Sequence, residues 1–209
     1  MDLIFRRRLA ALNYEEPETV LHRVMPIVVA LLQQPESVAH LSGKEKNAYL
    51  HQHQAAFLAF MLKHMVGSHA KVTLSMEELD DFDCVIKGDV EGQITYKPVQ
   101  LKHLPDHATN PNIEIQTIID GIKQKYRSSP ELVVAIWVNR DTTLDLASLD
   151  FTGLAIEQLW FLGDLPTGEP TIEGGGMSDL LAGVCLFGWM THGKGHFKQI
   201  RFKPPTVAT

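Results

Sequence analysis

The stretch "FDCVIKGDVEGQITYKPVQLKHL", residues 82–104, decides the fold because it predicts two β-strands joined by a tight turn. Both arms are rich in β-branched and aromatic residues, and Glu91-Gly92 separates them. If this pair forms the centre of a two-residue hairpin, counting outward along both arms puts Asp83 opposite Gln100. Side chains alternate along a strand, so Lys102 shares the face of Gln100 and lies diagonally across from Asp83. An acid, an amide and an amine are therefore expected at one corner of a sheet.

Pro98 sets a condition on this register. Proline cannot donate a backbone hydrogen bond, and a bulge at this position would shift the pairing by one residue and separate Asp83 from Gln100. Polar groups on one face of a central strand are costly unless they bond to each other, to water or to something functional. Gln100 and Lys102 therefore mark this corner as a candidate site.

The rest of the chain predicts further helices and strands. Ser42 and Glu45 form a predicted capping box for the helix over 43–66, with Gly67 as its stop and an apolar stripe from Tyr49 to Met65. The predicted helices cover residues 3–12, 18–34 (kinked or restarted at Pro26), 43–66, 112–127 (capped by Asn110) and a small one within 178–190. The predicted strands cover residues 71–76, 82–90, 94–104, 131–140, 154–164 and part of 196–204, with a loop over 164–176.

This order of elements predicts an α/β fold, with a central mixed β-sheet flanked by helices. Residues 1–43 are expected to form an N-terminal helical extension, and residues 44–209 the main α/β domain with its C-terminal tail.

Composition limits the classes of protein that need considering. With 209 residues, 44% hydrophobic and 21% charged, the chain fits a globular protein rather than a disordered or fibrous one. A net charge of −6 means that any nucleic-acid contact needs a local basic patch. Two cysteines fit a reducing compartment, there is no signal-peptide pattern, and "PIVVALL" is too short to span a bilayer. We expect a cytoplasmic protein without membrane contact, and a homodimer through the N-terminal helices stays open.

The pattern around residues 82–104 resembles the PD-(D/E)xK, or restriction-endonuclease-like, nuclease superfamily. The similarity covers about residues 44–164: helix, strand, strand with Asp83, strand with Gln100-Leu101-Lys102, helix, strand. It implies an αβββαβ core that hydrolyses phosphodiester bonds in nucleic acid with Mg²⁺ or Mn²⁺. It also implies that Asp83 and Gln100 hold the metal and that Lys102 positions or activates the attacking water. Such ions prefer oxygen ligands and lower the pKa of bound water.

Two features depart from the family pattern. Gln100 offers a neutral oxygen where the family usually has a carboxylate. The family often places a glutamate on its first helix, and the matching position is Ala56, with Gln54 the nearest polar side chain. Glu45 is the one acid of that helix and is assigned to the capping box. These departures keep a second hypothesis open: the same fold without catalysis, binding nucleic acid or a protein partner.

Other polar residues have two interpretations each. Gln116, Lys123 and Lys125 on the helix over 112–127 are either nucleic-acid contacts or ordinary solvated side chains. Arg6 to Arg8 either contact a phosphate backbone or form a solvated face. The ten histidines show no zinc-ligand spacing and are expected to be surface or core residues, with His103 close enough to the candidate site to be a secondary candidate.

Overall fold

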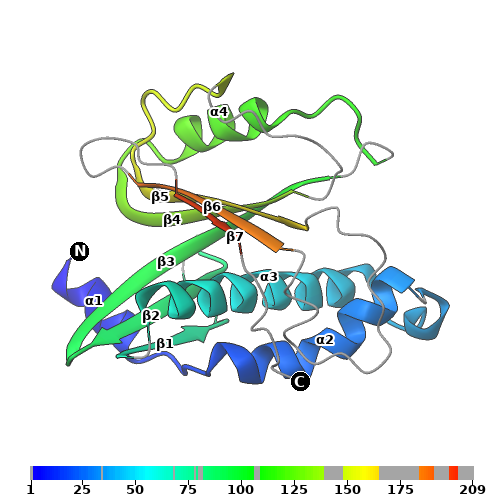
Figure 1. The fold of residues 1–209 in the computed structure, drawn as a ribbon, viewed down its shortest axis with the longest axis horizontal. Helices are drawn as coiled ribbons and strands as arrows, with labels where there is room; N and C mark the ends of the chain where they lie inside the picture. Colours follow the sequence, from blue (N-terminus) through cyan, green and yellow to red (C-terminus); the bar gives the residue numbers. More distant parts are fainter. Residues whose placement is uncertain are drawn as a thin grey trace, which may run out of the picture. The chain divides into compact units, whose positions relative to one another are not determined.

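The computed structural model describes residues 2–33, 35–67, 69–77, 79, 82–105, 109–138, 148–164, 184–190 and 198–201. The helices are α1 (Leu3–Ala10), α2 (Pro17–Gln33), the 3-10 helix η1 (Pro35–Val38), α3 (Gly43–Val66) and α4 (Ile115–Lys125) (Figure 1). The strands are β1 (Ala70–Ser75), β2 (Cys84–Val90), β3 (Gln93–Leu104), β4 (Ser129–Val138), β5 (Ile156–Asp164), β6 (Val184–Met190) and β7 (Lys198–Arg201). The chain divides into two compact units, residues 1–101 and 102–209, with the boundary inside β3. The boundary expected between residues 43 and 44 lies within the first unit.

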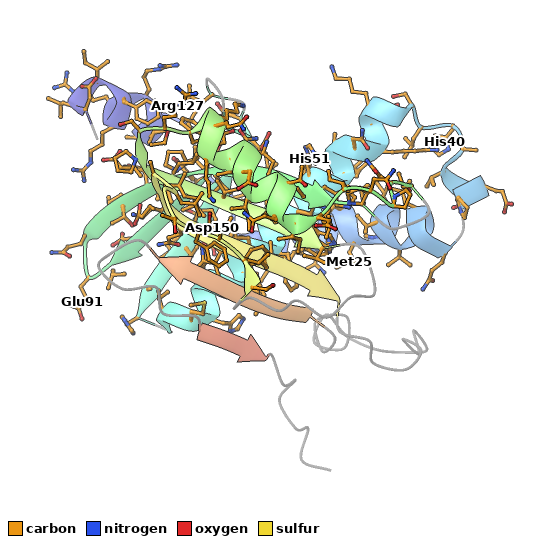
Figure 2. The ribbon with its side chains drawn as sticks, turned by 90° about the horizontal axis from the view of Figure 1, so that it is seen from above. Met25, His40, His51, Glu91, Arg127 and Asp150 are labelled. Atoms are coloured by element: carbon orange, nitrogen blue, oxygen red, sulfur yellow. The ribbon has the colours of Figure 1, made fainter. Side chains whose placement is uncertain are left out.

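The predicted hairpin register is confirmed. β2 and β3 pair antiparallel without a shift, from Val90 opposite Gln93 to Cys84 opposite Val99. Glu91 and Gly92 have φ angles of 52° and 83°, the positive values that a two-residue hairpin turn requires. Figure 2 shows Glu91 at the tip of this hairpin. Pro98 pairs with Val85 inside the unbroken register, so no bulge separates the two arms.

β1 extends the hairpin to three antiparallel strands, and helices pack on it. α3 contacts β1, and α2 lies beside α3 (Figure 1). The predicted capping box of α3 is confirmed: Ser42 Oγ accepts from the backbone of Glu45, whose carboxylate accepts from the backbone N–H of Ser42 at 2.8 Å. Gly67 ends the helix with φ at 88°, also as predicted.

Two details of these helices differ from expectation. Every residue from Gln54 to Met61 of α3 is buried, so the helix is enclosed on all sides there rather than buried along one stripe. α2 runs through Pro26 without a restart, and because Pro26 is exposed, the carbonyl group that its missing N–H leaves unpaired can reach water. Val28 is buried and its described neighbours from Ile27 to Leu31 are half-buried, so this stretch offers no fully exposed apolar stripe for a dimer.

The segment before α2 packs across one face of the three-stranded sheet. Leu9 of α1 is buried together with Val85 and Tyr96. The Phe5 ring lies 5.9 Å from the Phe82 ring, and Arg6 donates to the backbone oxygen of Ile94 at 3.1 Å. Further along, the backbone N–H and C=O of Glu15 both pair with Leu74, on the outer edge of β1.

The second unit combines parallel and antiparallel strands. β4 pairs parallel with β5, while β5, β6 and β7 pair antiparallel in sequence. β4 is buried throughout from Leu132 to Val138, as expected of a central parallel strand. The predicted mixed-sheet α/β class is thus confirmed. No helix within the described ranges has the length and apolarity needed to cross a membrane.

Two predictions for this unit are corrected. α4 begins at Ile115 rather than Asn112, because Asn110 forms a local turn with the backbone of Asn112 instead of capping the helix. Val184–Met190, expected within a small helix, is strand β6. The prediction was wrong because the spacing of a short apolar run fits a buried strand and a buried helix equally well. The rest of that predicted helix, most of the predicted loop over 164–176 and residues 139 and 140 lie outside the described residues.

Candidate site at the end of the β2–β3 hairpin

Asp83 and Gln100 meet as the hairpin predicts. Gln100 Nε2 donates a hydrogen bond to Asp83 Oδ2, and the backbone N–H of Leu101 donates to the same oxygen at 2.6 Å. The backbone N–H of Asp83 donates to Val99 O at 3.0 Å, which continues the ladder one residue beyond β2. The carboxylate therefore takes the place of a strand carbonyl group for Leu101, at the point where β2 ends.

This arrangement fixes the direction of the Asp83 carboxylate. Two N–H donors hold Oδ2 in place. Asp83 is half-buried and Gln100 is buried. Both hydrogen bonds go to Oδ2, so among the described residues Oδ1 is the carboxylate oxygen that a further ligand could use.

Gln100 turns its amide nitrogen, not its oxygen, toward Asp83. As a metal ligand it would have to present Oε1, which needs half a turn of the amide about its last side-chain bond. Alternation along β3 puts Lys102 on the same side of the strand as Gln100, and Lys102 is half-buried. His103 lies on the opposite side of β3 and is exposed.

The donor set fits one hard cation only in part. Asp83 supplies a carboxylate oxygen and Gln100 can supply an amide oxygen, whereas Mg²⁺ usually takes six oxygen ligands, including water and substrate phosphate. Within the part of the chain that the structure describes, no three His, Cys, Asp or Glu side chains gather as a metal site. On α3, Ala56 and Gln54 are both buried, and Gln54 has a relative exposure of 7%. The acids Asp80 and Asp81 lie outside the described residues.

Cys84 directly follows Asp83 but does not add a reactive group. Its thiol is buried, and burial followed by the charge of Asp83 raises its pKa. A thiol held neutral in this way is a poor nucleophile and a poor metal ligand. Cys84 is therefore a packing residue of β2.

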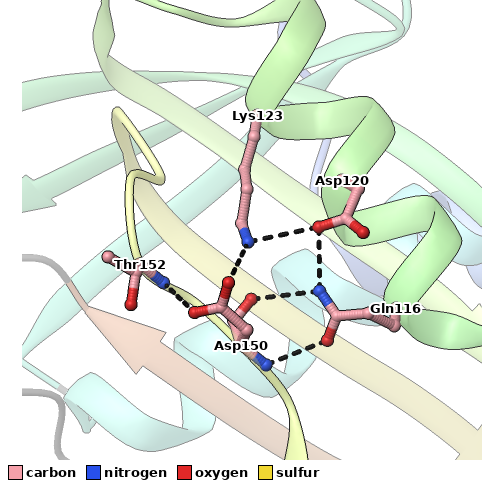
Figure 3. A network of polar contacts seen from close by, with 5 residues as sticks. All are labelled: Gln116, Asp120, Lys123, Asp150 and Thr152. Atoms are coloured by element: carbon pink, nitrogen blue, oxygen red, sulfur yellow. Dashed lines mark hydrogen bonds and ion pairs between the residues drawn. The ribbon is translucent and has the colours of Figure 1, made fainter.

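A second polar cluster joins α4 to the segment before β5 (Figure 3). Gln116 Oε1 accepts from the backbone N–H of Asp150 at 2.9 Å, and Gln116 Nε2 donates to the backbone oxygen of Asp150 at 3.2 Å. The amide thus pairs with both backbone groups of one residue, as a neighbouring strand would. Gln116 also donates to Asp120 at 2.9 Å. Its contacts are those of a residue that holds the connection between α4 and β5.

Lys123 lies between two carboxylates of the same cluster. Its ammonium is 3.0 Å from Asp150 and 3.2 Å from Asp120. The backbone N–H of Thr152, followed by Lys123, lowers the pKa of Asp150 to about 2. Gln116 and then Lys123 lower the pKa of Asp120. Burial opposes the charge of Lys123, but its bonds to Asp150 and Asp120 outweigh that effect and raise its pKa.

The three residues predicted to contact nucleic acid on α4 thus have partners inside the second unit. Gln116 and Lys123 belong to the cluster, and Lys125 lies 5.0 Å above the Tyr126 ring. With two acids around one lysine, this surface has little excess positive charge. Contact with nucleic acid there stays a prediction. Sequence analysis missed Asp150. An aspartate shortly before a glycine, here Gly153, often closes a turn by accepting from the backbone N–H two residues later, as Asp150 does from Thr152.

No protein-family model, curated protein or solved structure matches this chain.

Proposed function

We propose that this protein is a metal-dependent nuclease that hydrolyses phosphodiester bonds in nucleic acid at the Asp83–Gln100–Lys102 corner. The observation that carries the proposal is the contact between the Asp83 carboxylate and the Gln100 amide, on a hairpin whose register was predicted from the turn. The α/β fold with a mixed sheet is compatible with a restriction-endonuclease-like core. We propose that core as part of the same hypothesis.

Each residue has a role that its position supports. Asp83 carries the negative charge, and because its two N–H donors hold Oδ2, Oδ1 is proposed to bind the cation. Gln100 adds an amide oxygen after its half-turn. Lys102, on the same side of β3 as Gln100 by alternation, would supply the cation that positions the attacking water. Mg²⁺ or Mn²⁺ supplies a Lewis acid and an acidified water when bound.

Lys102→Ala tests the catalytic assignment. Labelled DNA and RNA oligonucleotides, single- and double-stranded, are incubated with the protein and Mg²⁺ or Mn²⁺, and cleavage is followed on denaturing gels. The variant should lose cleavage by about 100-fold or more while its melting temperature stays close to that of the wild type. Lys97→Ala is the matched control, because it removes the same charge from the opposite side of the same strand. Equal cleavage by wild type and Lys102→Ala would dispose of the assignment.

A second function is favoured by a specific observation. Asp83 Oδ2 already accepts two N–H groups, so the carboxylate has a structural use at the end of β2 without any metal. The same fold could therefore bind nucleic acid or a protein partner without catalysis. Calorimetry separates the two functions: a nuclease takes up Mn²⁺ in wild type and not in Asp83→Asn, whereas the non-catalytic module gives no uptake in either.

A further inference from the structure

We propose that the sheet face carrying Asp83, together with α1 packed on it, binds the phosphate backbone of nucleic acid through a cationic track. The cationic track consists of Arg6, Arg7 and Arg8 on α1, Lys87 on β2 and Lys71 on β1. This inference rests on the proposed function, because it names the surface by which the substrate reaches Asp83. It assigns the main binding contacts to α1 and the hairpin rather than to α4.

Strand register puts the lysines and the acid on one face. Along β2, Val85, Lys87 and Asp89 alternate with residues of the other face, and Asp83 continues this series. Lys87 is four residues from Asp83, about 13 Å along the strand. Lys71 lies opposite Asp89 on β1, and Thr73 lies opposite Lys87. The cations therefore lie on the same side of the sheet as Asp83, toward the hairpin tip.

Packing puts α1 on this same face. Leu9 is buried against Val85 and Tyr96, which belong to the Asp83 side by register. Phe5 contacts Phe82, the residue directly before Asp83. Arg6, Arg7 and Arg8 are all exposed, and Arg6 also ties the helix to Ile94. α1 thus covers the sheet face between Asp83 and Lys87, and its three arginines are exposed on the covering helix.

A pocket of about 250 Å³ lies on this face, against β1 and β2. Its lining consists of Tyr14, Lys71, Thr73, Lys87 and Asp89. The Lys87 ammonium lies 5.3 Å from the centre of the Tyr14 ring at the pocket. The Lys71 ammonium lies 3.7 Å from the Glu16 carboxylate, and the Lys71 side chain is 70% exposed. The Asp89 carboxylate accepts from the backbone N–H of Gly92 at 2.9 Å, so it is used in closing the hairpin turn.

Charge complementarity selects nucleic acid as the occupant. The whole chain carries a net charge of −6, so a polyanion needs a place where cations outnumber acids. Arginines near the end of α1 would be expected from helix stability alone, since cations are favoured there. That preference explains the arginines of α1 only. It does not explain why Lys87 on β2 and Lys71 on β1 lie on the same sheet face as Asp83. A surface that contacts the phosphate backbone of nucleic acid accounts for the arginines and the lysines together.

The test measures the salt dependence of binding. The full-length protein is titrated into a labelled DNA duplex of about 20 base pairs in EDTA, which prevents cleavage, at about 50 to 200 mM salt. Removal of two phosphate contacts by Arg7→Ala/Arg8→Ala should reduce the slope of log K against log salt by about 1.8. Over that range the wild type should lose roughly tenfold more affinity than the variant. Arg7→Lys/Arg8→Lys, which keeps both charges, should restore the slope.

The matched control is Lys44→Ala/Lys46→Ala, which removes two cations from the first turn of α3. It should leave the slope unchanged, and thermal melts confirm that both double variants fold. If the slope falls equally in the α1 and α3 double variants, or in neither of them, the inference is overturned. The nuclease proposal still stands in that case if Lys102→Ala abolishes cleavage. Conversely, a slope change confined to the α1 variant supports the inference even if the wild type cleaves nothing.

Exposed Leu3 and Ile4 beside the arginines would also suit an anionic membrane surface. Sedimentation with phosphatidylserine vesicles addresses that alternative. Arginine-dependent vesicle binding without any binding of the duplex or of single-stranded RNA overturns the inference and the nuclease proposal together.

Discussion

Replacing Asp83 should show that this carboxylate also holds the end of β2. In Asp83→Ala the backbone N–H of Leu101 loses its acceptor at 2.6 Å, and Gln100 Nε2 loses its own. Both residues have relative exposures of 7%, so water reaches these donors poorly. An unsatisfied buried donor costs about 1–3 kcal/mol, which puts the loss of unfolding free energy at about 2–6 kcal/mol for the two donors.

Asp83→Asn should be far milder. Its remaining oxygen, in the place of Oδ2, can still accept from both Leu101 and Gln100, so about 1 kcal/mol is expected for the weaker bonds to a neutral acceptor. The charge is lost in both variants, and uptake of Mn²⁺ should vanish in both. The pair therefore separates the structural role of Asp83 from its proposed role in metal binding.

Urea denaturation followed by circular dichroism measures the two free energies, and calorimetry measures the uptake of Mn²⁺. For a chain of this length, 3 kcal/mol corresponds to roughly 6–12 °C in melting temperature. If Asp83→Ala melts with the wild type, the Leu101 N–H does not depend on the carboxylate and our account of this strand end is wrong. If Asp83→Asn binds Mn²⁺ like the wild type, the metal assignment is wrong.

Three further predictions concern the hairpin turn and the cluster on α4. Gly92→Ala should lower the urea midpoint by the equivalent of about 1 kcal/mol, because its φ of 83° disfavours a side chain, and Gly43→Ala, at a residue with no positive φ, should not. Gln116→Ala should cost about 1–2 kcal/mol in the same assay, since it removes both bonds to the Asp150 backbone; an unchanged midpoint would mean that this pairing adds nothing. The pKa of Asp150 is lower in the folded protein, so its stabilisation is complete above about pH 4 and is lost as the pH falls toward 2. In Asp150→Asn the free energy of unfolding should therefore fall less steeply between about pH 4 and pH 2 than in the wild type. An equally steep fall would contradict the lowered pKa of Asp150.

Local rules predicted the hairpin and the caps well. The register follows from one turn, because Glu91-Gly92 fixes which residues face each other for the whole length of both arms. The capping box of α3 needs only Ser42 and Glu45, three positions apart. Such features depend on neighbours in the sequence and are therefore readable from it.

Features that depend on distant contacts were not readable. Sequence placed Gln100 opposite Asp83 but could not tell which end of its amide faces the carboxylate, since both ends fit the same position. The pairing between Gln116 and Asp150 joins residues 34 positions apart, so no local pattern reports it. The enclosure of α3 between Gln54 and Met61 likewise depends on what packs around the helix.

The pairing of Glu15 with Leu74 has a consequence for how this protein stays separate from its own copies. β1 is the border strand of its sheet, and bare borders tend to recruit a strand from another molecule. Both backbone groups of Glu15 pair with Leu74 on the outer edge of β1, so the segment before α2 blocks a further strand from pairing there. A form shortened beyond residue 16 would lose this pairing together with α1, and concentration-dependent fibres or stacked oligomers are the expected fate of such a fragment.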